Sequence, residues 1–188
     1  YGIAAGHWRQ TIVTGHARTE RYFDGLWRER LSRTYDAANP AGTRRVVERR
    51  FDADNRTVFE SYPQREIVSG DGALPGVNSV FDALGRSTPK RQSSELGDLL
   101  TYTAYLTGFL RQTTNPRGHA TTAAFHAFDA PAEDSITSIT APEGLTVTIA
   151  RDVFGKATAI TRSGLFNGSL VSATRAYVHD GNQRLCKT

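Results

Sequence analysis

The chain has 188 residues, a net charge of +4 and a hydrophobic content of 38%, which is low for one compact core. Aromatic residues make up 10% of it, and this content excludes a disordered chain. The 23 basic residues are spread along the sequence, which favours cross-strand pairs with acids over the basic patch of a nucleic-acid-binding protein.

The start of the chain suggests a piece of a longer, processed protein, and its single cysteine leaves the compartment undecided. The chain has no methionine, begins at Tyr1 and contains one cysteine, Cys186, so no disulfide can form within it. No apolar run approaches the roughly 20 residues of a membrane span. We therefore expect a fragment of a longer protein, organised as a single segment over residues 1–188.

Strand patterns dominate the first half of the chain. Apolar and polar residues alternate loosely over residues 8–15, which end on glycine, and this pattern predicts a strand. Residues 56–62 are predicted to form the strand that follows the turn at Asp52. Residues 43–50 also favour a strand, with a short helix as the alternative. Residues 63–77 hold the densest group of glycine and proline, which indicates a loop or an insertion.

The second half is more regular apart from one ambiguous stretch. Residues 95–110 carry a partial helical stripe of leucines, yet their threonines and tyrosines alternate as in a strand, and we favour the strand. Residues 145–149 and 157–161 alternate cleanly. No crossover helix is expected, so the strands should pair in an antiparallel meander.

A short phrase returns along the chain: an aromatic residue, an aspartate, three mostly small or turn-forming residues, then a base. Its clearest copy is Phe81–Arg86. Other copies contain Asp24, Asp52, Asp152 and Asp180, and two shorter ones contain Asp36 and Asp129. Such periodic self-similarity is the signature of a repeat protein.

The phrase has the chemistry of a hairpin turn. An aspartate that begins a type I turn can accept hydrogen bonds from backbone groups further on, and the fourth residue then favours a left-handed backbone. Gly85 and Gly155 suit that position, and Asn55 and Asn39 are the next most tolerant choice. We therefore interpret the aspartates as turn caps.

A second type of turn carries proline and glycine. Residues 115–118 end on Gly118 and residues 141–144 end on Gly144, each with proline at the second position. These turns alternate with the aspartate phrase along the second half. The pattern predicts two turn types on opposite edges of an all-β, antiparallel meander of repeated hairpins.

This combination of turns resembles the RHS, or YD-repeat, family. Phe81–Arg86 is a near-ideal match to the family's Tyr/Phe-Asp-x-x-Gly-Arg phrase, and residues 115–118, 141–144 and 149–156 fit the same scheme. The resemblance covers nearly the whole chain, most firmly residues 81–188. It implies a curved or spiralling sheet that forms part of a hollow β-shell.

The resemblance also implies a function. Shells of this family occur in bacterial polymorphic toxins and related surface proteins, where they enclose a C-terminal toxin or effector domain. The chain would then be a non-enzymatic wall segment whose partners are the remaining shell and the C-terminal domain of its parent. It would be secreted or displayed at the cell surface through that parent.

Other functions have weaker support in the sequence. The aromatic residues Trp8, Trp27, Tyr22 and Tyr102 are candidates for a carbohydrate- or receptor-binding surface, although packing beneath the sheet is favoured for them. The stretch from Asp52 begins like a calcium loop but has proline at the twelfth position, and the five histidines lack metal-ligand spacing. We therefore expect no catalytic residue, no metal and no cofactor, and rank a hydrolase based on the aspartates last.

Overall fold

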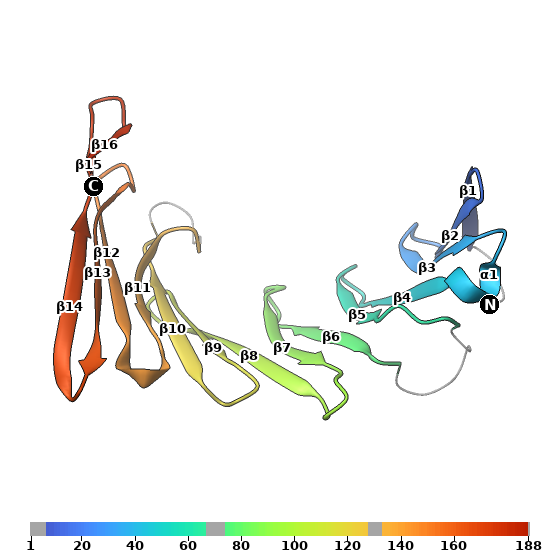
Figure 1. The fold of residues 1–188 in the computed structure, drawn as a ribbon, viewed down its shortest axis with the longest axis horizontal. Coiled ribbons are helices and arrows are strands. Elements are labelled where there is room, and N and C mark those ends of the chain that lie inside the picture. Colours follow the sequence, from blue (N-terminus) through green and yellow to red (C-terminus); the bar gives the residue numbers. More distant parts are fainter. Residues whose placement is uncertain (1–6, 67–73, 128–132, 188) are drawn as a thin grey trace. The chain divides into compact units, whose positions relative to one another are not determined.

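The protein is almost entirely β-structure. The computed structural model describes residues 7–66, 74–127 and 133–187. In these residues fourteen strands, β1 to β14, follow one another in chain order in one antiparallel sheet, and β15 and β16 form a separate two-stranded sheet (Figure 1). The predicted all-β antiparallel meander is thus confirmed, while its place in a shell stays a prediction.

The chain divides into two compact units, residues 1–100 and residues 101–188. The first unit contains one short helix between its third and fourth strands. Its elements are β1 (Trp8–Thr14), β2 (Ala17–Phe23), β3 (Glu29–Asp36), α1 (Pro40–Thr43), β4 (Arg45–Phe51), β5 (Thr57–Ser61), β6 (Gly76–Phe81) and β7 (Ser87–Gln92).

The second unit consists of hairpins and one turn of 3₁₀ helix. Strand β8 starts two residues before the unit boundary and is grouped with this unit. The elements are β8 (Leu99–Leu106), β9 (Leu110–Thr114), β10 (Ala120–Phe125), β11 (Ile136–Thr140), η1 (Pro142–Gly144), β12 (Thr146–Arg151), β13 (Ala157–Phe166), β14 (Ser169–Ala176), β15 (Val178–His179) and β16 (Leu185–Lys187).

One face of the first unit carries a small core. Leu31, Val46 and Phe59 lie on three successive strands and are buried. Because side chains alternate along a strand, the strand registers place these residues on the same face. Glu48 and Ser61 are buried beside them, and the Glu48 N–H donates to Ser61 Oγ at 2.9 Å.

The opposite face of the first unit carries a ladder of alternating charges. Arg21 on β2 lies 3.4 Å from Glu29 on β3. Arg49 on β4 pairs with Glu29 on one side and with Glu60 on β5, at 2.7 Å, on the other. This ladder crosses four strands and is the kind of arrangement that the spread of basic residues predicts.

On one face of the second unit, two long rows of cross-strand neighbours contain no charged side chain. Successive strand partners in each row lie directly opposite one another, so their side chains share a face. One row is Ala104, Gln112, Thr122, Thr140, Thr146, Ser163 and Ser172; the other is Leu106, Leu110, Ala124, Ser138, Thr148, Thr161 and Thr174. The aliphatic residues Ile139, Val147 and Ile160, together with Arg111 and Arg162, lie on the other face.

The ambiguous stretches resolve as strands. Residues 45–51 form β4, and the helix that precedes them ends at Thr43. Residues 99–106 form β8, so the strand interpretation of this stretch is confirmed. Within β8 the apolar set that includes Leu100, Tyr102 and Leu106 is the more exposed one, and the threonine set is half-buried.

Two predicted segments fall partly or wholly outside the described residues. In the predicted loop at 63–77, residues 67–73 lie outside them, and Gly76 already begins β6. The Tyr62 N–H donates to the Pro75 carbonyl at 2.8 Å, so the two ends of this loop are close together. The shorter phrase at Phe128 and Asp129 lies outside the described residues.

Candidate functional site

The aspartate of the clearest phrase caps its own turn. Asp82 Oδ1 accepts from the backbone N–H of Leu84 and of Arg86, both at 2.9 Å. The Gly85 N–H donates to the Asp82 carbonyl at 2.9 Å, and the Arg86 side chain bonds Asp82 Oδ2 through Nε at 2.8 Å. Every oxygen of Asp82 therefore serves the turn.

Six turns share this geometry, and we call them the capped turns. In each one the first residue's Oδ1 accepts from the N–H groups two and four residues on, at 2.8–3.1 Å. The six first residues are Asp24, Asp52, Asp82, Asn115, Asp152 and Asp180.

The fourth residue of each capped turn has a left-handed backbone. The φ angle is +77° at both Gly85 and Gly155, +82° at Gly118 and +66° at Asn55. The remaining two turns place Trp27, at +60°, and Gln183, at +65°, in the same conformation, which side chains other than glycine and asparagine rarely adopt. Neither tryptophan nor glutamine is a residue type from which a left-handed backbone would be predicted.

Two expectations about the turns are wrong. Asn39 has a φ of −144°, and its side chain instead caps α1 by accepting from the Gly42 N–H. The Pro-Gly turn at 115–118 is not a second turn type, because Asn115 caps it as the aspartates cap theirs. The turn at 141–144 does differ, since both Glu143 and Gly144 have a positive φ.

In the first unit, arginines also connect one capped turn to the next. Arg28 binds Asp24 within its own turn and donates through Nη1 to the Asp52 carbonyl at 3.2 Å. Its guanidinium lies 5.0 Å from the centre of the Phe51 ring. The next turn therefore receives both a hydrogen bond and a cation–π contact.

The same connection is repeated one hairpin later. Arg56 binds Asp52 and Asp54, donates to the Asp82 carbonyl at 3.4 Å and lies 5.0 Å from the centre of the Phe81 ring. We call Arg28 and Arg56 the bridging arginines. Because alternate connections of a meander lie at the same edge, these contacts fasten three turns into a row along one edge of the first unit.

The hydrogen bonds of the capped turns favour ionised aspartates. Side-chain and backbone hydrogen bonds from Arg86 hold the pKa of Asp82 below its usual value. Hydrogen bonds from the Arg56 backbone N–H, and to a smaller extent from its side chain, lower the pKa of Asp52. Burial alone would raise the pKa of Asp24, but the hydrogen bonds from Arg28 outweigh it and lower that pKa. Such carboxylates are poor proton donors, so these turns are suited to structure rather than to acid catalysis.

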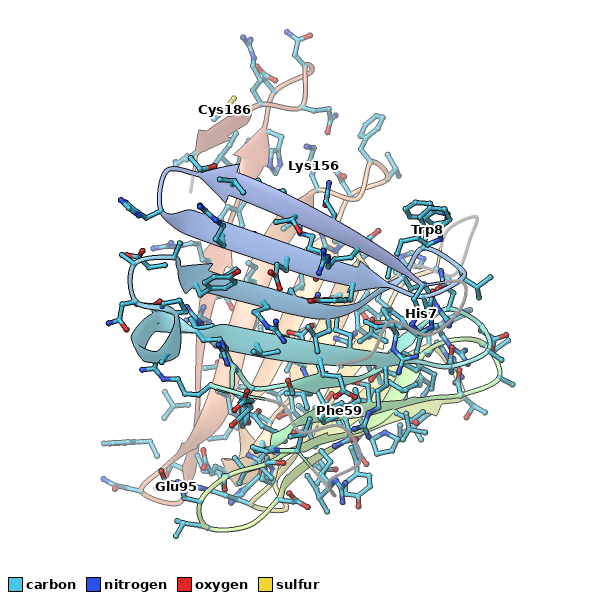
Figure 2. The ribbon with its side chains drawn as sticks, turned by 90° about the vertical axis from the view of Figure 1, so that its right-hand side faces the viewer. His7, Trp8, Phe59, Glu95, Lys156 and Cys186 are labelled. Carbon is cyan, nitrogen blue, oxygen red and sulfur yellow. The ribbon has the colours of Figure 1, made fainter. Side chains whose placement is uncertain are left out.

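The structure brings two of the four aromatic candidates together. The rings of Trp8 and Trp27 stack with their centroids 4.9 Å apart and 16° between their planes, and Phe23 lies 6.0 Å from Trp27. Trp8 is 53% exposed and Trp27 is 63% exposed, so packing beneath the sheet is wrong for both. Figure 2 shows the Trp8 side chain standing clear of the ribbon.

The other two aromatic candidates are Tyr22, in the first unit, and Tyr102, in the second unit. Tyr22 alternates with Phe23 along β2 and donates its hydroxyl to Glu20 at 3.1 Å. Tyr102 lies on β8 and is exposed. Tyr22 therefore does not join Trp8 and Trp27 in one aromatic platform.

The described residues contain no cluster of three or more histidine, cysteine or acidic side chains that could hold a metal ion. At the calcium-like stretch, Asp52 and Asp54 bind Arg56 and backbone groups. The part of the chain that the structure describes also has no helix that is long and apolar enough to cross a membrane.

Comparisons with known proteins leave the family open. No protein-family model matches the chain, and no curated protein matches it. A crystal structure of a porin-like protein from Bacteroides uniformis is similar over 89% of this chain and 92% of that chain, with 11% identity. Its TM-score of 0.29 is too low to support a conclusion on fold or function.

Proposed function

We propose that this chain is a non-catalytic wall segment of an RHS-type shell. Its role would be to enclose a toxin or effector domain that belongs to the same parent protein, which would be secreted or displayed at the cell surface. The observation that carries the proposal is the row of capped turns with its bridging arginines. The copies at Asp24 and Asp52 each close their own hairpin and hold the next one, which is what an extendable wall requires.

The composition of the sheet supports the same role. A wall has two faces, and neither needs the large apolar core of a compact domain. The described residues bury four hydrophobic side chains, Leu31, Val46, Phe59 and Phe125. The charged ladder and the uncharged rows give the remaining strands polar faces that tolerate water.

Protease protection of the parent protein tests this proposal. A domain enclosed by the wall should be cut far more slowly in the intact parent than as an isolated domain. Replacement of both bridging arginines (Arg28→Gln with Arg56→Gln) should open the wall and raise the cutting rate, whereas Arg117→Gln, at an exposed turn, should not. Equal cutting of the enclosed and isolated domains would contradict containment.

Carbohydrate binding is a second candidate because of the Trp8–Trp27 pair. Indole rings stack on the apolar faces of sugars, and this pair is exposed although Trp27 occupies a left-handed position that costs roughly 1 kcal/mol or more. A strained backbone and an exposed aromatic ring at one residue are features that binding surfaces also have.

A glycan array with Trp27→Gly and Trp8→Ala tests this candidate. Glycine relieves the positive φ of Trp27, so that variant should remain folded while it loses any glycan signal. Phe154→Ala, which removes an exposed aromatic ring from a turn of the second unit, is the matched control. Absence of hits with the wild-type chain, or hits that survive Trp27→Gly, would remove the carbohydrate candidate.

A further inference from the structure

Two arginines of the first unit face each other where strand register would favour opposite charges. Val46 and Gln64 form an isolated antiparallel bridge, with backbone hydrogen bonds of 2.7 and 2.9 Å. One step along this register places Arg45 opposite Arg65. The next step places Arg44 opposite Glu66, and these two make a salt bridge at 3.2 Å, which supports the register.

The two arginines line one cavity of about 420 Å³. Its lining consists of Gly42, Thr43, Arg44, Arg45, Pro63, Gln64 and Arg65, and contains no acidic residue. Arg65 donates to the Gly42 carbonyl, which holds its guanidinium at the end of α1. Three arginines from two neighbouring segments of the same unit therefore line this cavity.

Arg44 is paired with Glu66, but the other two arginines at this cavity have no acidic partner among the described residues. Among residues 7–66, 74–127 and 133–187, neither Arg45 nor Arg65 forms a salt bridge, and Arg44 Nε is buried without a hydrogen-bond acceptor. On the same sheet Arg21 and Arg49 are matched by acids in the charged ladder. Like charges directly opposite one another destabilise a strand pair, so a bound anion would relieve this cost.

We propose that the cavity at Arg45 and Arg65 binds a tetrahedral oxyanion of the phosphate type, either free or carried on a lipid headgroup. Guanidinium groups donate paired hydrogen bonds that match the oxygens of such an anion. The buried Arg44 Nε supplies a further donor that has no partner among the described residues. This site lies at the end of α1 and the chain that follows β5, and it does not depend on the wall function.

Titration of the 188-residue chain with inorganic phosphate tests the site, at constant ionic strength set by chloride. Calorimetry should show saturable binding, and the melting temperature should rise with phosphate concentration. Arg45→Gln and Arg65→Gln should each weaken binding by about tenfold, because each removes a charge-assisted hydrogen bond. Arg45→Lys keeps the charge but loses the planar fork, so it should fold as wild type and bind more weakly.

Arg117→Gln is the matched control, since it removes one exposed positive charge from a turn in the second unit. Its binding should equal that of the wild type. Vesicles of phosphatidylcholine with and without phosphatidic acid distinguish the two sources of the phosphate group. Binding to phosphatidic acid vesicles but not to free phosphate assigns the group to a lipid. Binding to neither, or an equal loss with Arg117→Gln, would overturn the proposal.

Discussion

The two units contain hairpins of the same kind, but different side chains connect the neighbouring hairpins within each unit. In the first unit, bridging arginines join three capped turns at one edge, and a ladder of four charged residues crosses one face. In the second unit, two rows on one face hold threonine, serine, alanine and glutamine, with leucine at one end. At the Asp152 turn the base is Lys156, whose backbone N–H makes the cap.

This difference shows that the capped turn and the contacts between turns are separable. The turn itself recurs in both units with the same hydrogen bonds. The contacts between turns depend on arginine in the last position of the phrase and on an aromatic ring in the next copy. Stability of the first unit should therefore depend on charge, whereas that of the second should depend mainly on the turns and strand pairing.

The largest effect is expected from a β-branched residue at a left-handed position. Gly85→Val and Gly155→Val alter turns with the same φ of +77°, one in each unit. Each should lower the free energy of unfolding by about 1–3 kcal/mol, because valine strongly disfavours that backbone. Urea unfolding followed by circular dichroism measures both.

The control for this pair is Gly85→Asn. Asparagine already occupies the equivalent position at Asn55, so the variant should lose much less stability than Gly85→Val. His119→Ala should be nearly silent, because the contacts of His119 in its turn are made by its backbone: its N–H donates to Asn115 Oδ1, and its carbonyl accepts from the Asn115 N–H. A valine variant with wild-type stability would contradict the assignment of the turn in that unit.

A smaller effect is expected when a bridging arginine is removed. Arg56→Gln loses contacts to Asp52, Asp54 and the next turn, and its side chain is only 26% exposed. The expected loss is about 1–2 kcal/mol, discounted for partial exposure. Lys156→Gln, the counterpart in the second unit, should cost less than about 0.5 kcal/mol. An equal loss of unfolding free energy in the two variants would contradict the proposed difference between the units.

Acid should weaken the capped turns of the first unit. The pKa values of Asp24, Asp52 and Asp82 are lower in the folded chain than the roughly 3.9 of an unfolded aspartate. Their contribution to stability is therefore present above about pH 4 and is lost as the pH falls through the folded pKa values. Both tryptophans lie in the first unit, so fluorescence follows this unit specifically.

Asp82→Asn sharpens the test of pH dependence. Asparagine keeps the oxygen that caps the turn, as Asn115 does in the second unit, but cannot ionise. The variant should have a smaller loss of stability between pH 5 and the acid limit than the wild type. An unchanged pH dependence would indicate that Asp82 does not contribute to it.

The smallest effect is expected in the charged ladder. Glu29→Gln leaves Arg21 and Arg49 without their shared acid, on a face that is partly open to solvent. The cost should be roughly 0.5–1 kcal/mol at low salt and smaller at high salt, since salt screens such pairs. Thr148→Ser, in an uncharged row of the second unit, should show no comparable salt dependence.

Much of the fold was predictable because its signals are local. Alternation of side chains predicts strands, and aspartate followed by glycine or asparagine predicts a turn from a few residues alone. The strand from Leu99 to Leu106 and the turn at Asp82 follow from these patterns. The capped turn at Asn115 does not follow from them, because Pro116 and Gly118 are equally typical of a turn without a side-chain cap.

Other features depend on register and could not be read from short windows. The bridging contact from Arg56 to the Asp82 carbonyl joins residues 26 positions apart. The opposition of Arg45 and Arg65 follows from an isolated bridge between Val46 and Gln64. Exposure of Trp8 and Trp27 depends on which parts of the sheet are covered, and sequence alternation does not specify that.

A double-mutant cycle between Arg56 and Phe81 tests the central claim most directly, namely that the bridging arginines join the three capped turns of the first unit. The cycle combines Arg56→Gln, Phe81→Leu and the double variant, each measured by urea unfolding with tryptophan fluorescence. The guanidinium lies 5.0 Å from the ring centre, so we predict a coupling free energy of about 0.5–1 kcal/mol. Additive losses, with no coupling between the two residues, would contradict the claim.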